Sequence, residues 1–180
     1  NLILCLALLC GAAVLAAQAP QWQWAVGAGG PGFGIDVWDS GKSIATDSQG
    51  NQYVTGTFLG TATFGSHVLT ASGDEGYPDI FIARLDPSGN WLWAVKAGGT
   101  GWDEGGDIAV DGAGNAYVTG GFCGTATFGS HSLTANGYYY CDIFVAKLDP
   151  NGNWLWAVQV GGTSGDAGYG IALDGVGNAY

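Results

Sequence analysis

Short apolar and β-prone runs along this chain are separated by one recurring polar pattern, D-x-x-G-N. Asp at the first position can accept hydrogen bonds from the turn backbone, and Gly takes the left-handed conformation that closes a short loop. Runs bounded in this way are typical of antiparallel hairpins, so the chain is predicted to consist of strands. The pattern begins at Asp47, Asp86, Asp111, Asp149 and Asp174.

A second turn signal predicts a further, smaller hairpin in each unit. The segment GTATFGS at 60–66 returns unchanged at 124–130. In both copies Gly-Ser separates two short β-prone runs, and Gly at the first of two central residues is the signature of a type II′ turn. Each unit is therefore predicted to contain four main strands and one inserted hairpin.

The units recur with a period of 63 residues, since NWLWAV at 90–95 returns at 153–158. The third main strand of the first unit is apolar on both faces from Ile80 to Ala83. A sheet wet on one face alternates apolar and polar residues, whereas a sheet packed between neighbouring sheets does not. Propeller blades are packed in that way. The sequence predicts an all-β fold, a β-propeller fragment of about two and a half four-stranded antiparallel blades, each with an inserted β-hairpin.

The first residues resemble a secretory signal peptide. Leu2 to Ala17 carries no charge and is rich in Leu and Ala, and it is shorter than the ~20 apolar residues that a membrane span needs. The alternative is a membrane anchor that is left uncut.

We expect this sequence to be a piece of a longer reading frame, in which the remaining blades pack against the blades predicted here. The predicted divisions are a signal peptide at 1–19, an N-terminal strand and loop that would complete the last blade at 20–38, blade 1 at 39–99, blade 2 at 100–162, and the start of a truncated blade 3 at 163–180.

The charge of the chain limits its partners. Four Lys plus Arg stand against 15 Asp plus Glu, a net charge of −11. Such a surface repels nucleic acid and anionic lipid, and it suits cations, basic partners or simple solubility. With the leader, this predicts a secreted or cell-surface protein that meets a protein or glycan at the extracellular surface. No membrane span is expected after signal cleavage.

Two cysteines carry the sharpest local signal. Cys123 and Cys141 both lie in the second unit, and the first unit has Leu59 and Pro78 at these places. Two thiols that are present together and absent together predict a disulfide in an exported chain. The alternative is a pair of free buried thiols.

Three aspartates hold the same place in successive units. Asp39, Asp103 and Asp166 each precede x-Gly in the loop that leads to the first strand of a unit. In a propeller that loop lies near the mouth of the central channel, where one carboxylate per blade could form a ring that holds Ca²⁺, a cation that takes six to eight oxygens. The alternative is that each carboxylate bonds its own turn backbone.

Aromatic residues supply the remaining candidate contacts. Trp38 and Trp102 directly precede two of these aspartates, where they could form a sugar-binding lip. Tyr138, Tyr139 and Tyr140 lie in the long loop before the third strand and could form a contact surface. No G-x-S-x-G, P-loop or H-E-x-x-H occurs in the chain, so no catalytic residue and no bound cofactor are assigned.

Two longer segments of the sequence resemble a known repeat. Residues 103–120 follow D-x-G-x-x-I-A-V-D-x-x-G-N-x-Y-V-T-G, and residues 142–156 follow D-I-F-V-A-K-L-D-P-x-G-N-x-L-W. These strings resemble the bacterial β-propeller repeat called SBBP and, more loosely, NHL-type propeller repeats. The resemblance implies a secreted or surface propeller of several blades without catalytic residues. The function expected is a non-catalytic binding or scaffold module, and the alternative is a lectin or hydrolase propeller whose site lies in blades outside this sequence.

Overall fold

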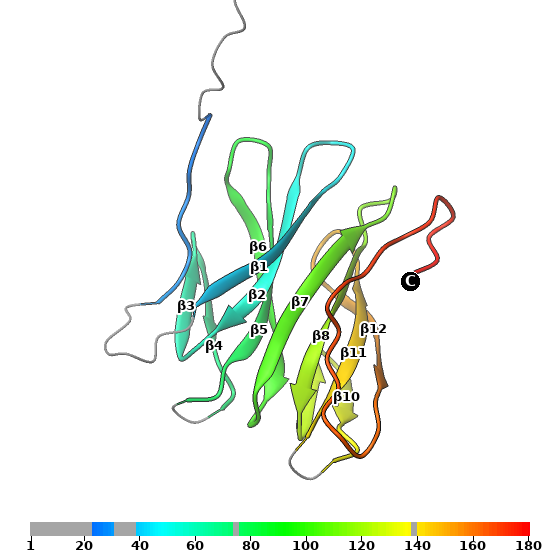
Figure 1. Cartoon of the computed structure of the whole chain (residues 1–180). Helices are drawn as coiled ribbons and strands as arrows, with labels where there is room; N and C mark the ends of the chain where they lie inside the picture. The colour runs from blue at the N-terminus through cyan, green and yellow to red at the C-terminus, as the bar shows by residue number, and fades with distance from the viewer. Residues whose placement is uncertain (1–22, 31–38, 74–75, 138–139) are drawn as a thin grey trace, which may run out of the picture.

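The computed structural model describes most of the chain after the predicted leader (Figure 1). The described residues contain strands joined by turns, with no helix that could cross a membrane. The predicted signal peptide lies outside the described residues, as do Trp38, Tyr138 and Tyr139. The described ranges are 23–30, 39–73, 76–137 and 140–180.

Two antiparallel four-stranded units form the body of the molecule, and they confirm the predicted all-β architecture. Their strand orders are β1-β2-β5-β6 in the first unit and β12-β11-β8-β7 in the second. We call these units blade 1 and blade 2. Blade 1 consists of β1 (Ser40–Thr46), β2 (Gln52–Phe58), β5 (Asp79–Leu85) and β6 (Trp91–Gly99). Blade 2 consists of β7 (Asp103–Val110), β8 (Ala116–Cys123), β11 (Cys141–Leu148) and β12 (Trp154–Val160).

The D-x-x-G-N turns form as predicted, and each is held by its aspartate. In the turn after β5, Asp86 Oδ1 accepts hydrogen bonds from the backbone N–H groups of Ser88 and Asn90. The Asn90 side-chain amide donates to Asp86 Oδ2 at 2.8 Å. This bond from Asn90, together with the backbone bonds, holds the pKa of Asp86 below its ordinary value. Gly89 has a φ of 84°, the left-handed conformation that the turn requires.

The inserted hairpins also form, with turns of the predicted type. They are β3–β4 (Thr61–Phe64 and His67–Thr70) and β9–β10 (Thr125–Phe128 and His131–Thr134). Gly65 and Gly129 have φ values of 61° and 63°, and the described non-glycine residues have no positive φ, as a type II′ turn demands.

The hairpin of blade 2 does not stay with its own sheet. Strand β9 pairs with β6 of blade 1, so that Gly98 faces Thr127 and Gly99 faces Ala126. The sheet of blade 1 thereby extends to six strands in the order β1-β2-β5-β6-β9-β10. The hairpin β9–β10 therefore joins blade 2 to blade 1.

The segment before blade 1 takes the place that β6 takes for blade 2. Gly29 and Thr63 of β3 exchange two backbone hydrogen bonds, at 3.2 and 2.9 Å. The indole N–H of Trp24 donates to the Pro87 carbonyl at 2.9 Å, as the indole N–H of Trp93 donates to the Pro150 carbonyl at 3.0 Å. Residues 23–30 thus pair with a free edge of the hairpin β3–β4, as an unpaired strand tends to do.

The residues after blade 2 begin a third unit. The Asp166 N–H donates to the Cys141 carbonyl at 2.7 Å, as the Asp103 N–H donates to the Pro78 carbonyl at 3.0 Å. The Gly168 N–H donates to the Gly120 carbonyl, so this segment runs beside blade 2 in Figure 1. We call residues 163–180 the third-blade segment. The described residues stack as successive blades, and their sheets do not close into a ring.

Candidate binding site

The predicted disulfide is confirmed. Cys123 and Cys141 are bonded and lie directly opposite each other in the pairing of β8 with β11. Their Cα atoms are 4.1 Å apart. The bond closes the loop that carries the hairpin β9–β10, and it joins the end of β8 to the start of β11, the two inner strands of blade 2.

The three first-strand aspartates each bind backbone N–H groups. Asp103 Oδ2 accepts from the Gly99 N–H at 2.6 Å, and Asp103 Oδ1 accepts from the Cys123 N–H at 3.2 Å. The carboxylate thereby connects the end of blade 1 to the second strand of blade 2. Asp39 accepts from Gly30 and Leu59 in the same manner.

These aspartates do not gather into a cation site in the part of the chain that the structure describes. Asp166 accepts from the Gly162 N–H at 2.9 Å, in the next copy of the same arrangement. No three His, Cys, Asp or Glu side chains among the described residues are grouped so that they could hold a metal ion. The hydrogen bonds show carboxylates engaged by backbone N–H groups, partly within their own loops, as at Gly99 and Gly162, and partly from the second strands, as at Leu59 and Cys123.

A second buried carboxylate lies beside Asp103. Asp79 Oδ2 accepts from the Lys96 ammonium at 3.1 Å, while Asp79 Oδ1 is buried without a hydrogen-bond partner among the described residues. A Cβ placed on Gly98 would lie 2.5 Å from Asp79 Oδ1 and 2.9 Å from Asp103 Oδ2, so the two carboxylates approach each other across this glycine. Burial raises the pKa of Asp103 to about 7, and the charge of Asp79 adds to the effect. Asp103 therefore retains a proton well above the pH at which an ordinary aspartate loses it.

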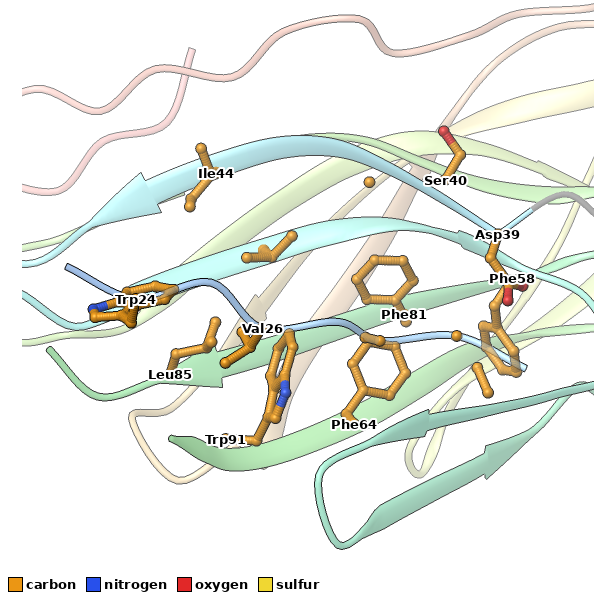
Figure 2. Close-up of a pocket in the computed structure, with 15 residues that line it drawn as sticks. Trp24, Val26, Asp39, Ser40, Ile44, Phe58, Phe64, Phe81, Leu85 and Trp91 are labelled. Carbon is orange, nitrogen blue, oxygen red and sulfur yellow. The ribbon is translucent and has the colours of Figure 1, made fainter. Parts of the chain in front are cut away.

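The larger cavity, about 300 Å³, lies on the open face of blade 1. Figure 2 shows Phe64, Phe81 and Trp91, from three different strands, turned toward the same space beside Trp24 and Val26 of the N-terminal segment. Ile44 on this face is 62% exposed.

Blade 2 has the same face, and there it is covered. Ile108, which holds the place of Ile44, is only 4% exposed, because blade 1 packs on it. Phe144 and Leu148 are fully buried, and the corresponding Phe81 and Leu85 are only 6% and 2% exposed, so the difference between the two faces is greatest at Ile44 and Ile108. The larger cavity therefore lies on the face of blade 1 that corresponds to the face of blade 2 covered by packing between blades.

A smaller groove of about 190 Å³ lies between blade 2 and the third-blade segment. It is lined by two aromatic residues, Trp102 and Tyr169, and by two acids, Glu104 and Asp166. Trp102 is 42% exposed and Tyr169 is 89% exposed. Its remaining wall is mostly glycine, together with Ala167 and the bonded Cys141.

Two residues for which the sequence predicts different functions lie together in this groove. Trp102 was a candidate sugar contact and Asp166 a candidate metal ligand, and both line the groove. Tyr140 is exposed in the loop next to the disulfide and does not line it. Sequence reasoning did not find Glu104 and Tyr169, although the differences between units at these positions are a usable signal.

Comparisons with known proteins agree with the architecture. No family model matches the chain. The chain is similar to an uncharacterized WD repeat-containing protein of Acanthamoeba polyphaga mimivirus, with 33% identity over 106 residues that cover 49% of this chain. The matched part is 7% of the length of that protein. The stacked four-stranded blades and this similarity together support a β-propeller-type repeat fold.

Proposed function

We propose that this chain is part of a non-catalytic binding or scaffold module in an exported β-propeller protein with SBBP-type repeats. The observation that carries the proposal is the equivalence of the units. The same aspartates, tryptophans and glycines make the same contacts from one blade to the next. An enzyme needs polar groups gathered at one place with mutual geometry, and repeated structural contacts do not supply that.

The polar groups of the blades are largely engaged in holding the backbone. The aspartates of the D-x-x-G-N turns bind their own turn N–H groups, as Asp111 binds Ala113 and Asn115. The first-strand aspartates bind the ends of neighbouring strands. A carboxylate committed to two backbone donors is poorly placed to serve as a general acid or base, which must reach a substrate proton.

Export is supported by the chemistry of the chain rather than by any comparison. A disulfide persists in oxidising compartments and is rare in the cytosol. The bond between Cys123 and Cys141, the uncharged leader and the net charge of −11 all suit an extracellular surface. Partners are therefore sought among extracellular proteins, and glycans form the second class because aromatic side chains stand beside carboxylates in the groove.

The proposal is tested with the purified protein in two assays. In the first, the protein is incubated with panels of glycoside, ester, phosphate and peptide substrates, and no turnover is expected. In the second, photo-cross-linking in extracellular extract is expected to capture a partner in a saturable manner that unlabelled protein competes away. Turnover that a single substitution abolishes would contradict the non-catalytic assignment. A glycan array screened in parallel decides between a protein partner and a lectin.

A further inference from the structure

We propose that the groove between blade 2 and the third-blade segment binds a lysine or arginine side chain of a partner protein. The inference rests on the proposed binding function and names the chemistry of its partner. The inference comes from a difference between successive junctions of the blades, because an ion pair at the first junction is replaced by uncharged residues at the next.

The junction between blade 1 and blade 2 contains an ion pair whose two side chains are each 39% exposed. Lys42 of β1 lies 2.5 Å from Glu104 of β7, measured from Nζ to Oε1. Lys42 follows Gly41, which faces Gly56, and in blade 2 Gly106 follows Gly105, which faces Gly120. Gly106 therefore holds the place of Lys42 at the next junction.

The acidic residue of the ion pair, Glu104, is also replaced at the junction between blade 2 and the third-blade segment. Asp103 and Asp166 hold equivalent positions in successive units. Each donates its backbone N–H to a carbonyl at the start of the third main strand of the unit before it, which is β5 for Asp103 and β11 for Asp166. The residue after Asp103 is Glu104, and the residue after Asp166 is Ala167. The ion pair of the first junction is thus replaced by Gly106 and Ala167, and both of these residues line the groove.

The chain cannot easily fill this space with a side chain of its own at position 106. A Cβ on Gly106 would lie 2.5 Å from the Gly168 carbonyl oxygen, closer than real Cβ contacts. Because the obstacle is backbone, it does not move aside at low cost. Position 106 therefore does not supply a cation to this junction.

The walls of the groove suit a cation. The faces of Trp and Tyr attract ammonium and guanidinium groups, and carboxylates form charge-assisted hydrogen bonds with both. Trp102 and Tyr169 supply the aromatic groups, and Asp166 supplies a carboxylate that takes part in none of the ion pairs among the described residues. The described lining contains no Lys or Arg.

The volume of the groove and the net charge of the protein further limit which ligand can bind there. The groove, about 190 Å³, is smaller than the ~300–1,000 Å³ of pockets that hold drug-sized ligands. It accommodates one side chain, while the rest of the partner stays on the rim. The net charge of −11 steers basic partners toward the protein at low ionic strength.

The test is an NMR titration of the ¹⁵N-labelled protein with single amino-acid probes. Nα-acetyl-lysine amide and Nα-acetyl-arginine amide are expected to shift the Trp102 indole N–H and the Gly106 and Gly168 amides in a saturable manner, with dissociation constants in the millimolar range. Nα-acetyl-norleucine amide, which keeps the alkyl chain and lacks the charge, is the control probe and is expected to leave these signals in place. Methyl glucoside tests the sugar alternative.

Variants connect the binding to the groove. Asp166→Asn keeps the acceptor for the Gly162 N–H and removes the charge, and it is expected to weaken probe binding about tenfold. Ala167→Lys supplies an internal ammonium and is expected to abolish binding, while Ala167→Gln, of similar length, is expected to retain most of it. Asp86→Asn removes the same charge in a distant turn and is expected to change little.

The outcomes separate this inference from the proposed function. Glucoside binding without lysine or arginine binding overturns the cationic assignment, and equal binding of norleucine does so as well. If none of the probes shifts the groove signals while a partner is still captured by cross-linking, the groove assignment fails and the binding function stands. If the protein turns over a substrate, the proposed function fails whatever the probes do.

Discussion

Replacement of Ile108 by alanine should destabilise the protein far more than replacement of Ile44 by alanine. The two isoleucines hold the same place in successive blades and have the same local sequence pattern, I-A-x-D. Ile108 is 4% exposed because blade 1 covers it, whereas Ile44 is 62% exposed. The pair therefore isolates the contribution of packing between blades from that of the strand itself.

The expected magnitudes differ clearly. Truncation of a buried isoleucine to alanine costs about 2–5 kcal/mol, from lost transfer free energy and the cavity left behind. We expect about 3 kcal/mol for Ile108→Ala. Surface substitutions away from special features change stability by about 0.5 kcal/mol or less, and this is the expectation for Ile44→Ala.

Urea unfolding followed by tryptophan fluorescence measures both values. With a slope of about 2 kcal/mol per molar urea, the midpoint of Ile108→Ala should fall by roughly 1.5 M, and that of Ile44→Ala should move by a few tenths at most. Equal losses that depend on protein concentration would mean that the blade 1 face is covered in solution by another copy. A loss below about 1 kcal/mol for Ile108→Ala would refute the stacking of the blades.

Three further predictions concern the carboxylates and the disulfide. The folded protein holds the pKa of Asp103 at about 7 against about 4 in an unfolded chain. Its contribution to stability is therefore greatest below pH 4 and is lost as the pH rises to 7. Between pH 4 and 8 the unfolding free energy of Asp103→Asn relative to wild type should rise by up to about 4 kcal/mol, and a constant difference would contradict the pKa. The double variant Cys123→Ser, Cys141→Ser should lose about 3 kcal/mol, and reductant should lower the melting temperature of the wild type only; equal sensitivity of both proteins would argue against the bond. Calorimetric titration with Ca²⁺ should show no saturable heat, because the first-strand aspartates are engaged by N–H groups, and a clear isotherm would restore the cation ring.

Local pattern is sufficient to predict the strands and turns of this protein. The D-x-x-G-N motif combines an acceptor for the turn N–H groups with a glycine at the left-handed position, and Gly50 and Gly114 have φ values of 83° and 82° there. The type II′ hairpins follow from Gly-Ser between β-prone runs in the same way. These features depend on residues a few positions apart, which is the range that pattern reasoning covers.

The pairing of the hairpin with the neighbouring sheet is not predictable from such patterns. Strand β9 pairs with β6 through Gly98 and Gly99, which lie 26 or more positions before it. The edge of a sheet accepts any extended partner, because its free N–H and C=O groups carry no sequence code. Only the stacking of the blades brings these two strands together.

The candidate site is predictable in part. The disulfide follows from two cysteines confined to one unit, and Trp102 and Asp166 are recognisable as residues beside the first strands. The groove that unites Trp102 with Asp166 arises between blades, from the exchange of Lys42 for Gly106 and of Glu104 for Ala167. A comparison of charge between equivalent positions of the units reveals this exchange, whereas a search for motifs does not.

The most direct test of the account is a measurement of nuclear Overhauser effects across the junction of the blades. We predict cross-strand effects between Gly98 or Gly99 of blade 1 and Ala126 or Thr127 of the blade 2 hairpin, because these residues are paired. We also expect slow hydrogen exchange for the amides of this pairing. If the nuclear Overhauser effects of the hairpin β9–β10 connect it only to strands of blade 2, the pairing of β9 with β6 is contradicted. The stacked arrangement of the blades is then contradicted as well.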